Sequence, residues 1–401
     1  MMRHVGLRSS QSVIGKLIDR KFLRQRRQTA TAFAVLLLPA CTTIDTKVRP
    51  APPLRGACAP VTSAPAEAKA HPLGSQIDRR LQASSPSGSF LFVKQGEVVL
   101  RKSYGAISAA GPAIKADTVF MIASLAKSFT AAAILRLKEE GRLKLTDRVD
   151  RFFPSAPPAT AGIIIHQLLT HTAGLPREVL EDREVVDRDT VVARVLQATL
   201  QSPPGSRRAY SNGGFMLLGA IIEKASGMSF DAYLDTAIIQ PAGLQDTGFP
   251  SPRKYAATRV AQQLNTPGFT TPLDEPASRG WYRRGSGALF STIRDLERWQ
   301  SALRCGRVLS PESVALLFSP AVVFAPGDTA YTGYGWVIER GPAGPVWWHN
   351  GQWGAYYAEI RMYPQVNSLA IMVSNRGDRA LEAAWEATTQ MLVAEQPAPS
   401  S

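Results

Sequence analysis

Short apolar runs of the kind found in β-strands occur near both ends of the folded part of the chain. Two such runs flank Gln95-Gly96 between Phe90 and Leu100, and this arrangement predicts a β-hairpin. Three more runs come late, at residues 335–339, 355–363 and 369–373. These segments predict strands contributed by both halves of the chain.

The middle of the chain has helical rather than strand-like periodicity. From Ser124 to Glu140 apolar residues recur at helical spacing, and Gly141 stands where a helix would end. A second helix is predicted over 215–225 and a last one over 379–393. Strands at both ends of a helical middle predict an α+β fold, in which one antiparallel sheet is flanked by helices and a mainly helical domain is inserted.

We place the folded domain at residues 74–395. Its sheet part would comprise residues 74–124 and 285–395, and its helical part residues 125–284, with a tail at 396–401. The composition fits such a domain, because 45% of residues are hydrophobic and only 19% are charged. This composition excludes a wholly disordered, collagen-like or disulfide-knotted chain.

The formal charge of +14 raises the question of a nucleic-acid partner. Residues 1–41 contain eight of the 46 Lys and Arg residues but only one of the 32 acids, so half of the net charge lies there. The remaining basic residues form no stripe, and no glycine-rich phosphate loop occurs. We therefore expect a small-molecule or peptide substrate, with no nucleic acid and no nucleotide cofactor.

The pattern of the basic N-terminal segment predicts an export signal. It leads into an apolar run from Thr29 to Ala40, which is too short to span a bilayer and has the length of a signal core. Leu38-Pro39-Ala40-Cys41 then resembles the lipobox of bacterial lipoproteins, in which the cysteine is acylated, although Pro39 is unusual there. We expect a periplasmic protein anchored by lipid at Cys41 to the outer membrane, with simple secretion as the alternative.

Residues 42–73 are rich in Pro and Ala and have few large apolar side chains, which is typical of a flexible tether. Cys58 lies in this tether and Cys305 in the folded domain. Export would permit the two to form a disulfide, and two free thiols are the alternative. The sequence carries no prediction of oligomeric state.

Ser124-Leu125-Ala126-Lys127 places a hydroxyl and an amine on one face at the start of a helix. The apolar residues 120–123 would desolvate Lys127, and desolvation lowers the pKa of an amine. The backbone N–H of a serine at a helix N-terminus is free to bind an oxyanion. A second Ser-x-x-Lys, Ser251 to Lys254, lies in a Pro-rich charged stretch and predicts only a turn.

Partner groups for a serine nucleophile appear downstream. Tyr210-Ser211-Asn212 is the only Tyr-x-Asn of the chain, and His349-Asn350-Gly351 is the only His-x-Gly after the basic N-terminal segment, which contains His4-Val5-Gly6. In order and spacing, the three motifs resemble those of the penicillin-recognising serine hydrolases, in the class C β-lactamase-like branch that includes esterases, D-amino-acid peptidases and D,D-peptidases. The resemblance covers about residues 75–395, and stretches such as Gln167 to Leu175 strengthen it.

The resemblance implies a role for each motif residue and no cofactor. Ser124 would be the nucleophile, Lys127 its proton acceptor or electrostatic partner, and Tyr210 the general base. Asn212 would bond an amide of the substrate, and His349 would face the substrate from an edge strand. Gly351 and Gln352 would complete the substrate side of the site. The N–H groups of Ser124 and Gln352 would form the oxyanion hole.

His349 is informative about the substrate. The β-lactamases of this family usually have a lysine there, a permanent cation for the antibiotic's carboxylate, whereas the charge of a histidine ordinarily depends on pH near neutrality. We therefore expect a hydrolase of esters or amides, including peptides and D-amino-acid amides. The alternatives are a β-lactamase or D,D-carboxypeptidase, and a non-catalytic penicillin-binding-like envelope sensor; retention of all the motif side chains favours an enzyme.

Two further groups of residues have a functional and a structural interpretation. His166 and His171 would suit a metal pair, but no Glu or Cys falls at zinc spacing, so structural histidines and no metal are expected. Five aromatic residues near His349 would either line an apolar subsite or pack a strand: Trp347, Trp348, Trp353, Tyr356 and Tyr357.

Overall fold

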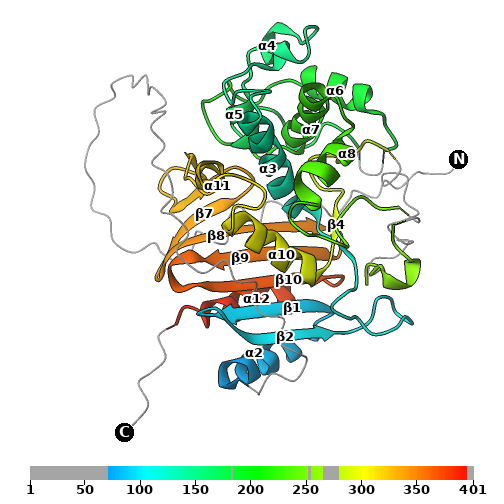
Figure 1. Cartoon of the computed structure of the whole chain (residues 1–401), viewed down its shortest axis with the longest axis vertical. Helices are drawn as coiled ribbons and strands as arrows, with labels where there is room; N and C mark the ends of the chain where they lie inside the picture. The colour runs from blue at the N-terminus through cyan, green and yellow to red at the C-terminus, as the bar shows by residue number, and fades with distance from the viewer. Residues whose placement is uncertain (1–70, 182–183, 252–253, 265–279, 395–401) are drawn as a thin grey trace, which may run out of the picture. The chain divides into compact units, whose positions relative to one another are not determined.

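An antiparallel sheet of eight strands forms the base of the fold, in the order β2-β1-β10-β9-β8-β7-β6-β5 (Figure 1). The computed structural model describes residues 71–181, 184–251, 254–264 and 280–394. β1 pairs with β10, so the first strands of the domain lie beside the last one. This confirms the predicted α+β fold with one sheet built from both halves of the chain. The strands are β1 Gly88–Lys94, β2 Glu97–Tyr104, β5 Val322–Val323, β6 Ala330–Thr332, β7 Val337–Gly341, β8 Gly344–Trp353, β9 Tyr356–Tyr363 and β10 Ser368–Ser374.

The predicted hairpin is confirmed as β1 and β2. Its two turn residues, Gln95 and Gly96, have φ angles of 52° and 88°. Two consecutive residues with positive φ give a turn whose twist matches that of the strands, and glycine takes up such angles without strain.

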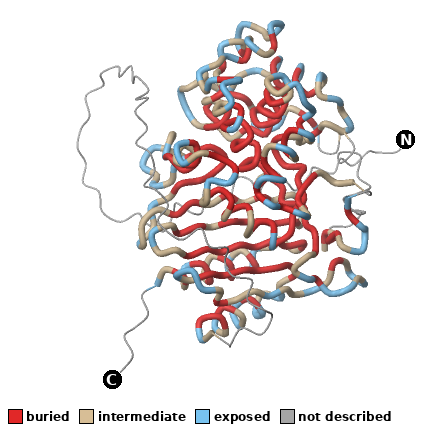
Figure 2. Tube along the Cα trace, viewed as in Figure 1, coloured by how far each residue is buried: buried red, intermediate tan, exposed pale blue. Residues whose placement is uncertain are grey.

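The two faces of the sheet are covered by different helices. Along β1, Leu91 and Val93 belong to the large core cluster that includes α3, α7 and α10, whereas Phe90 and Phe92 pack with α2 and α12. This alternation follows from the two-residue period of a strand. Figure 2 shows the buried residues concentrated along the strands and the helices of the larger core.

Helices fill the middle of the chain, as predicted. α3 Ala126–Glu139 is followed by Gly141 at φ 70°, and α7 Asn212–Ser226 ends at Gly227 at φ 75°. Ser211 caps α7 by accepting a hydrogen bond from Gly214 N. The remaining helices are α2 Pro72–Gln82, α4 Pro158–Ala161, α5 Ile165–Leu169, α6 Arg188–Leu196, α8 Phe230–Leu234, α10 Ile293–Arg304, α11 Pro311–Leu317 and α12 Arg379–Gln390.

The hydrophobic pattern did not predict the strand that carries His349, which only the family resemblance implied. β8 runs Gly344–Trp353 and contains a proline, two glycines and several polar residues, so it has neither alternation nor a continuous apolar run. It forms because β9 hydrogen-bonds along it from Trp347 to Trp353. A two-stranded ladder, β3 Phe120–Met121 with β4 Phe290–Ser291, was also missed.

The described residues all belong to one compact unit. The proposed division at 124/125 and 284/285 stays a prediction. The signal segment, Cys41, the tether and Cys58 lie outside the described residues. Within the described ranges, no helix has both the length and the apolar character that a bilayer crossing requires.

Candidate active site

Ser124 lies in a 3₁₀ turn, Ala123–Leu125, that leads directly into α3. Ala123 has a φ of 44°, a conformation that side-chain-bearing residues rarely adopt and that costs about 1–2 kcal/mol. The turn leaves the Ser124 side chain half-buried while its neighbours Ala123 and Leu125 are buried. The predicted nucleophile therefore stands at a strained corner where β3 passes into the helix.

Lys127 is fully buried in the first turn of α3 and donates three hydrogen bonds. Its Nζ lies 3.2 Å from Ser124 Oγ, 2.7 Å from Asn212 Oδ1 and 2.7 Å from the carbonyl oxygen of Ser286. Burial lowers the pKa of Lys127 below its ordinary value. The desolvation expected from the sequence is present, and it raises the unprotonated fraction of the amine at a given pH.

Tyr210 donates a hydrogen bond from its Oη to Ser124 Oγ over 2.9 Å. Burial by itself would raise the pKa of this phenol, but the nearby Lys127, the Ser124 hydroxyl and Arg177 together lower it below 10. The Lys127 Nζ lies 4.9 Å and the Arg177 guanidinium 5.0 Å from the centre of the Tyr210 ring. Two cations therefore stabilise the phenolate form.

Asn212 is the first residue of α7, and both the oxygen and the nitrogen of its side-chain amide form hydrogen bonds. Its Oδ1 accepts from Lys127, and its Nδ2 donates to Glu178 Oε1 over 2.5 Å. A lysine can only donate and a carboxylate can only accept, so the orientation of the amide is determined by its partners. Asn212 thus connects the reactive side of the site to an exposed loop.

His349 lies on β8. We expected an edge strand here, and that prediction is wrong. β8 is paired with β9 on one side and β7 on the other. However, the β7 ladder stops at Trp348, and from His349 onward only β9 pairs with β8. The sheet therefore opens at the residue where the predicted substrate contact begins.

The surroundings of His349 keep it uncharged at neutral pH. The residue is 8% exposed, and its Nδ1 has no hydrogen-bond partner among the described residues. Burial, with smaller effects from Lys127 and Arg208, lowers its pKa to about 3. His349 is consequently a neutral imidazole at neutral pH.

Gly351 and Gln352 follow His349 along β8. A β-carbon on Gly351 would lie 2.1 Å from the Ile122 carbonyl oxygen and 2.7 Å from Ser124 N. The strand backbone therefore packs directly on the turn that carries Ser124. Gln352, half-buried, continues the strand opposite Tyr357, one position past this contact.

Several residues near these groups were not predicted to serve the site. His171, interpreted as structural, accepts from Ser211 N over 3.2 Å and has its ring 4.4 Å from that of Tyr210. The sequence did contain a signal for a role of His171, because it lies in the Gln167 to Leu175 stretch that strengthens the family resemblance. Glu178 and Ser286, in contrast, lie in loops without any distinguishing pattern. His166 bonds Tyr334 Oη over 2.7 Å, and among the described residues no cluster of three metal-binding side chains occurs.

The aromatic residues near His349 mostly pack the core. Trp347 stacks on Phe318 with ring centres 4.2 Å apart. Tyr356 and Tyr357 are also buried, and their hydroxyls donate to Ala261 O and Glu359 Oε2. Trp348 and Trp353 are only half-buried. The packing interpretation therefore holds for Trp347, Tyr356 and Tyr357.

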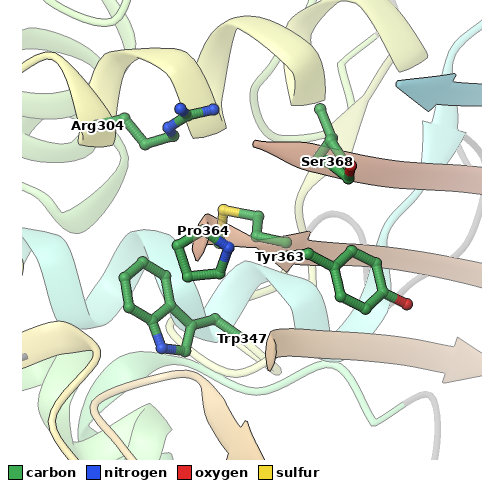
Figure 3. A pocket seen from close by; sticks show the side chains of 7 residues that line it. Arg304, Trp347, Tyr363, Pro364 and Ser368 are labelled. Carbon is green, nitrogen blue, oxygen red and sulfur yellow. The ribbon is translucent and has the colours of Figure 1, made fainter. Parts of the chain in front are cut away.

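A small pocket lies between the last residue of α10, Arg304, and strands β8, β9 and β10, and Trp347 is among the residues that line it (Figure 3). Its volume is about 10 Å³, enough for roughly one water molecule. Ser368 Oγ already accepts from Gln95 N and donates to Val366 O. The pocket is a gap in packing with no reactive group. Cys305 follows Arg304, is half-buried and forms no disulfide with any described residue; Cys58, its possible partner, lies outside the described residues.

Known proteins resemble this chain in sequence and in fold. The family model described as Beta-lactamase matches residues 73–394. Penicillin-binding protein 4* of Bacillus subtilis (strain 168) is 30% identical over 311 residues, covering 72% of this chain and 68% of that protein. Esterase EstB of Burkholderia gladioli is 28% identical over 348 residues, covering 75% and 88%. The crystal structure of a penicillin binding protein from Bacillus halodurans superposes with a TM-score of 0.67 at 25% identity, covering 78% of this chain and 99% of that one.

Proposed function

The chain belongs to the β-lactamase family of serine hydrolases, and from this premise we propose that it hydrolyses an ester or amide through an acyl-enzyme at Ser124. One observation carries the proposal. Tyr210 Oη and Lys127 Nζ both lie within hydrogen-bond distance of Ser124 Oγ, at 2.9 and 3.2 Å. A hydroxyl held between a phenol of lowered pKa and an amine of lowered pKa is an activated nucleophile.

The proposed reaction has two halves. Ser124 Oγ attacks the substrate carbonyl while its proton passes to Tyr210 Oη, and the oxyanion is held by the N–H groups of Ser124 and Gln352. Collapse of this intermediate returns the proton from Tyr210 to the leaving alcohol or amine. Water then attacks the acyl-enzyme by the same route, releasing the acid and restoring Ser124.

Lys127 would act mainly as an electrostatic partner. Its three hydrogen bonds hold it beside Ser124, and its charge lowers the pKa of the Tyr210 phenol. The favourable interaction between the Lys127 cation and a phenolate would make Tyr210 the base at neutral pH. Placement in the class C-like branch, which uses a Tyr-x-Asn motif in this way, is part of the proposal.

A second candidate is hydrolysis of β-lactams or cell-wall D,D-peptides. The relative named Penicillin-binding protein 4* favours it, as do the cations Arg177, Arg208 and Arg283, whose charges act on the site. Against it stands the neutral His349, which provides no permanent charge for a carboxylate. We therefore rank it below ester or amide hydrolysis.

Burst-phase kinetics with a p-nitrophenyl ester test the proposal. A burst followed by a steady rate is expected for a hydrolase. A burst equal to the enzyme concentration with no further release would indicate a sensor that is acylated without turnover, and no burst or turnover would refute an acyl-enzyme. A parallel screen over esters, D-amino-acid amides, peptides and β-lactams then ranks the substrate classes.

We also propose that the protein is exported and anchored by lipid at Cys41, with residues 42–73 as the tether. The signal-like apolar run and the lipobox-like Leu38 to Cys41 support this. The catalytic domain would then act at a membrane surface without entering it.

A further inference from the structure

Glu178 occupies a position that a substrate is expected to use. Its carboxylate accepts a 2.5 Å hydrogen bond from Asn212 Nδ2, and the family resemblance implies that the Asn212 side chain bonds a substrate amide. Arg283 NH1 lies 3.9 Å from the same carboxylate oxygen. In the free protein, an amide donor and a guanidinium therefore hold a carboxylate that belongs to the chain itself.

The backbone around Glu178 is tied down, so only its side chain has to move. Asn212 N donates to the Arg177 carbonyl over 2.9 Å, and Ser211 Oγ donates to the Pro176 carbonyl over 2.7 Å. Both bonds join this loop to the first turn of α7. The Glu178 side chain is 39% exposed and can rotate into solvent without breaking either bond.

The two groups that hold Glu178 are better fixed than Glu178 itself. Asn212 is 5% exposed and is anchored through Oδ1 to the buried Lys127. The Arg283 side chain is 18% exposed, and its backbone has a left-handed φ of 60°. If the Glu178 side chain swung out, a preorganised pair of donors would remain beside the nucleophile, and such a pair suits a carboxylate.

We propose that Asn212 Nδ2 and Arg283 form an acyl-side subsite for substrates that bear a carboxylate, and that Glu178 is a specificity-determining residue which occupies this subsite in the free protein. The inference rests on the proposed function for its link to catalysis. A neutral acyl group would displace Glu178 without forming a new ion pair with Arg283. An anionic acyl group would displace Glu178 and form an ion pair with Arg283 in its place.

Binding of adipate, measured by titration calorimetry on the full-length protein, tests the subsite without requiring turnover. Glu178→Ala is expected to bind adipate about tenfold more tightly than wild type, because it removes the internal competitor. The double variant Glu178→Ala/Arg283→Met should lose this gain. Glu181→Ala removes the same charge from an exposed position in the same loop and should bind as wild type does.

Turnover provides the second readout. The ratio of kcat/KM for mono-p-nitrophenyl adipate to that for p-nitrophenyl hexanoate should rise about tenfold in Glu178→Ala relative to wild type, because the two esters differ only in the terminal carboxylate. Thermal melting of each variant shows whether it is folded.

The two proposals fail in different ways. If adipate binds Glu178→Ala no more tightly than wild type, or if Glu181→Ala gives the same gain, the subsite is refuted even when both esters are hydrolysed. If neither ester is hydrolysed by any variant while the adipate gain is present, the subsite stands and the hydrolase proposal falls.

Discussion

The backbone of Gly351 lies against the backbone amide of Ser124, so that a β-carbon on Gly351 would come within 2.7 Å of Ser124 N. The close approach brings strand β8 onto the corner that carries the predicted nucleophile. It also explains, in physical terms, why the third residue of the His-x-Gly motif is a glycine here: any side chain would push the strand and the serine apart.

Gly351→Ala is therefore expected to lower kcat/KM by about 10²-fold, because a displacement near 1 Å at a reacting group has that order of effect. Kinetics with a p-nitrophenyl ester measure it. Gly162→Ala is the control, since a β-carbon there meets nothing closer than 3.9 Å and should leave the rate unchanged. Wild-type rates in Gly351→Ala would show that the contact between β8 and Ser124 has no catalytic importance.

Ser124→Ala should abolish turnover, with a loss on the order of 10⁶-fold, and leave the fold intact. The side chain is half-buried and its removal costs only its hydrogen bonds with Tyr210 and Lys127. The second Ser-x-x-Lys offers a matched control, because Ser251→Ala should keep the wild-type rate. More than a few per cent of wild-type activity in Ser124→Ala would exclude this serine as the nucleophile.

Tyr210→Phe should lower kcat by about 10²- to 10⁴-fold, the usual contribution of a general base. The pKa of Tyr210 is lowered, so the wild-type rate should rise with pH through a value below 10, and this rise should vanish in the variant. Tyr255→Phe, at a buried tyrosine whose hydroxyl bonds Asp246 O, should retain both the rate and the pH profile. An unchanged kcat in Tyr210→Phe would mean that proton transfer runs through Lys127 alone.

His349 should make stability depend on pH. Its pKa is about 3 when folded and near 6.5 when unfolded, so between these values the unfolded chain binds a proton that the folded chain does not. The free energy of unfolding therefore falls as pH is lowered below 6.5, by about 2 kcal/mol between pH 7 and pH 5 from this residue.

Urea unfolding at pH 7 and pH 5 measures this contribution. His349→Gln should show a correspondingly smaller loss of stability between the two pH values, while part of the loss remains because burial also lowers the pKa of His171. Equal losses in wild type and His349→Gln would contradict the buried neutral state of His349.

Cys41→Ser should prevent the incorporation of radiolabelled palmitate, whereas Cys58→Ser, in the same tether, should not. Wild-type protein is expected in the membrane fraction, and Thr42, in the place of the Asp that usually signals inner-membrane retention, favours the outer membrane. Wild type that takes up no label would end the lipoprotein proposal.

The local pattern of the sequence was sufficient for the elements that satisfy their own periodicity. The β1–β2 hairpin, α3, α7, β9, β10 and α12 all have apolar spacing that matches their structure, and each was predicted. The order of the Ser-x-x-Lys, Tyr-x-Asn and His-x-Gly motifs likewise indicated the family, because the residue types and spacing of short motifs can be recognised from the sequence alone.

What the tertiary structure decided concerns contacts between distant segments. β8 is a strand because β7 and β9 pair with it, and the neutral state of His349 follows from burial that no local pattern encodes. Glu178 reaches Asn212 across 34 positions of sequence through a loop without periodicity. Burial and long-range pairing depend on how the elements pack together, whereas periodicity and motif chemistry are properties of each local segment. For that reason the sequence predicted Ser124, Lys127 and Tyr210 as the reactive groups but not the Glu178 carboxylate that bonds Asn212.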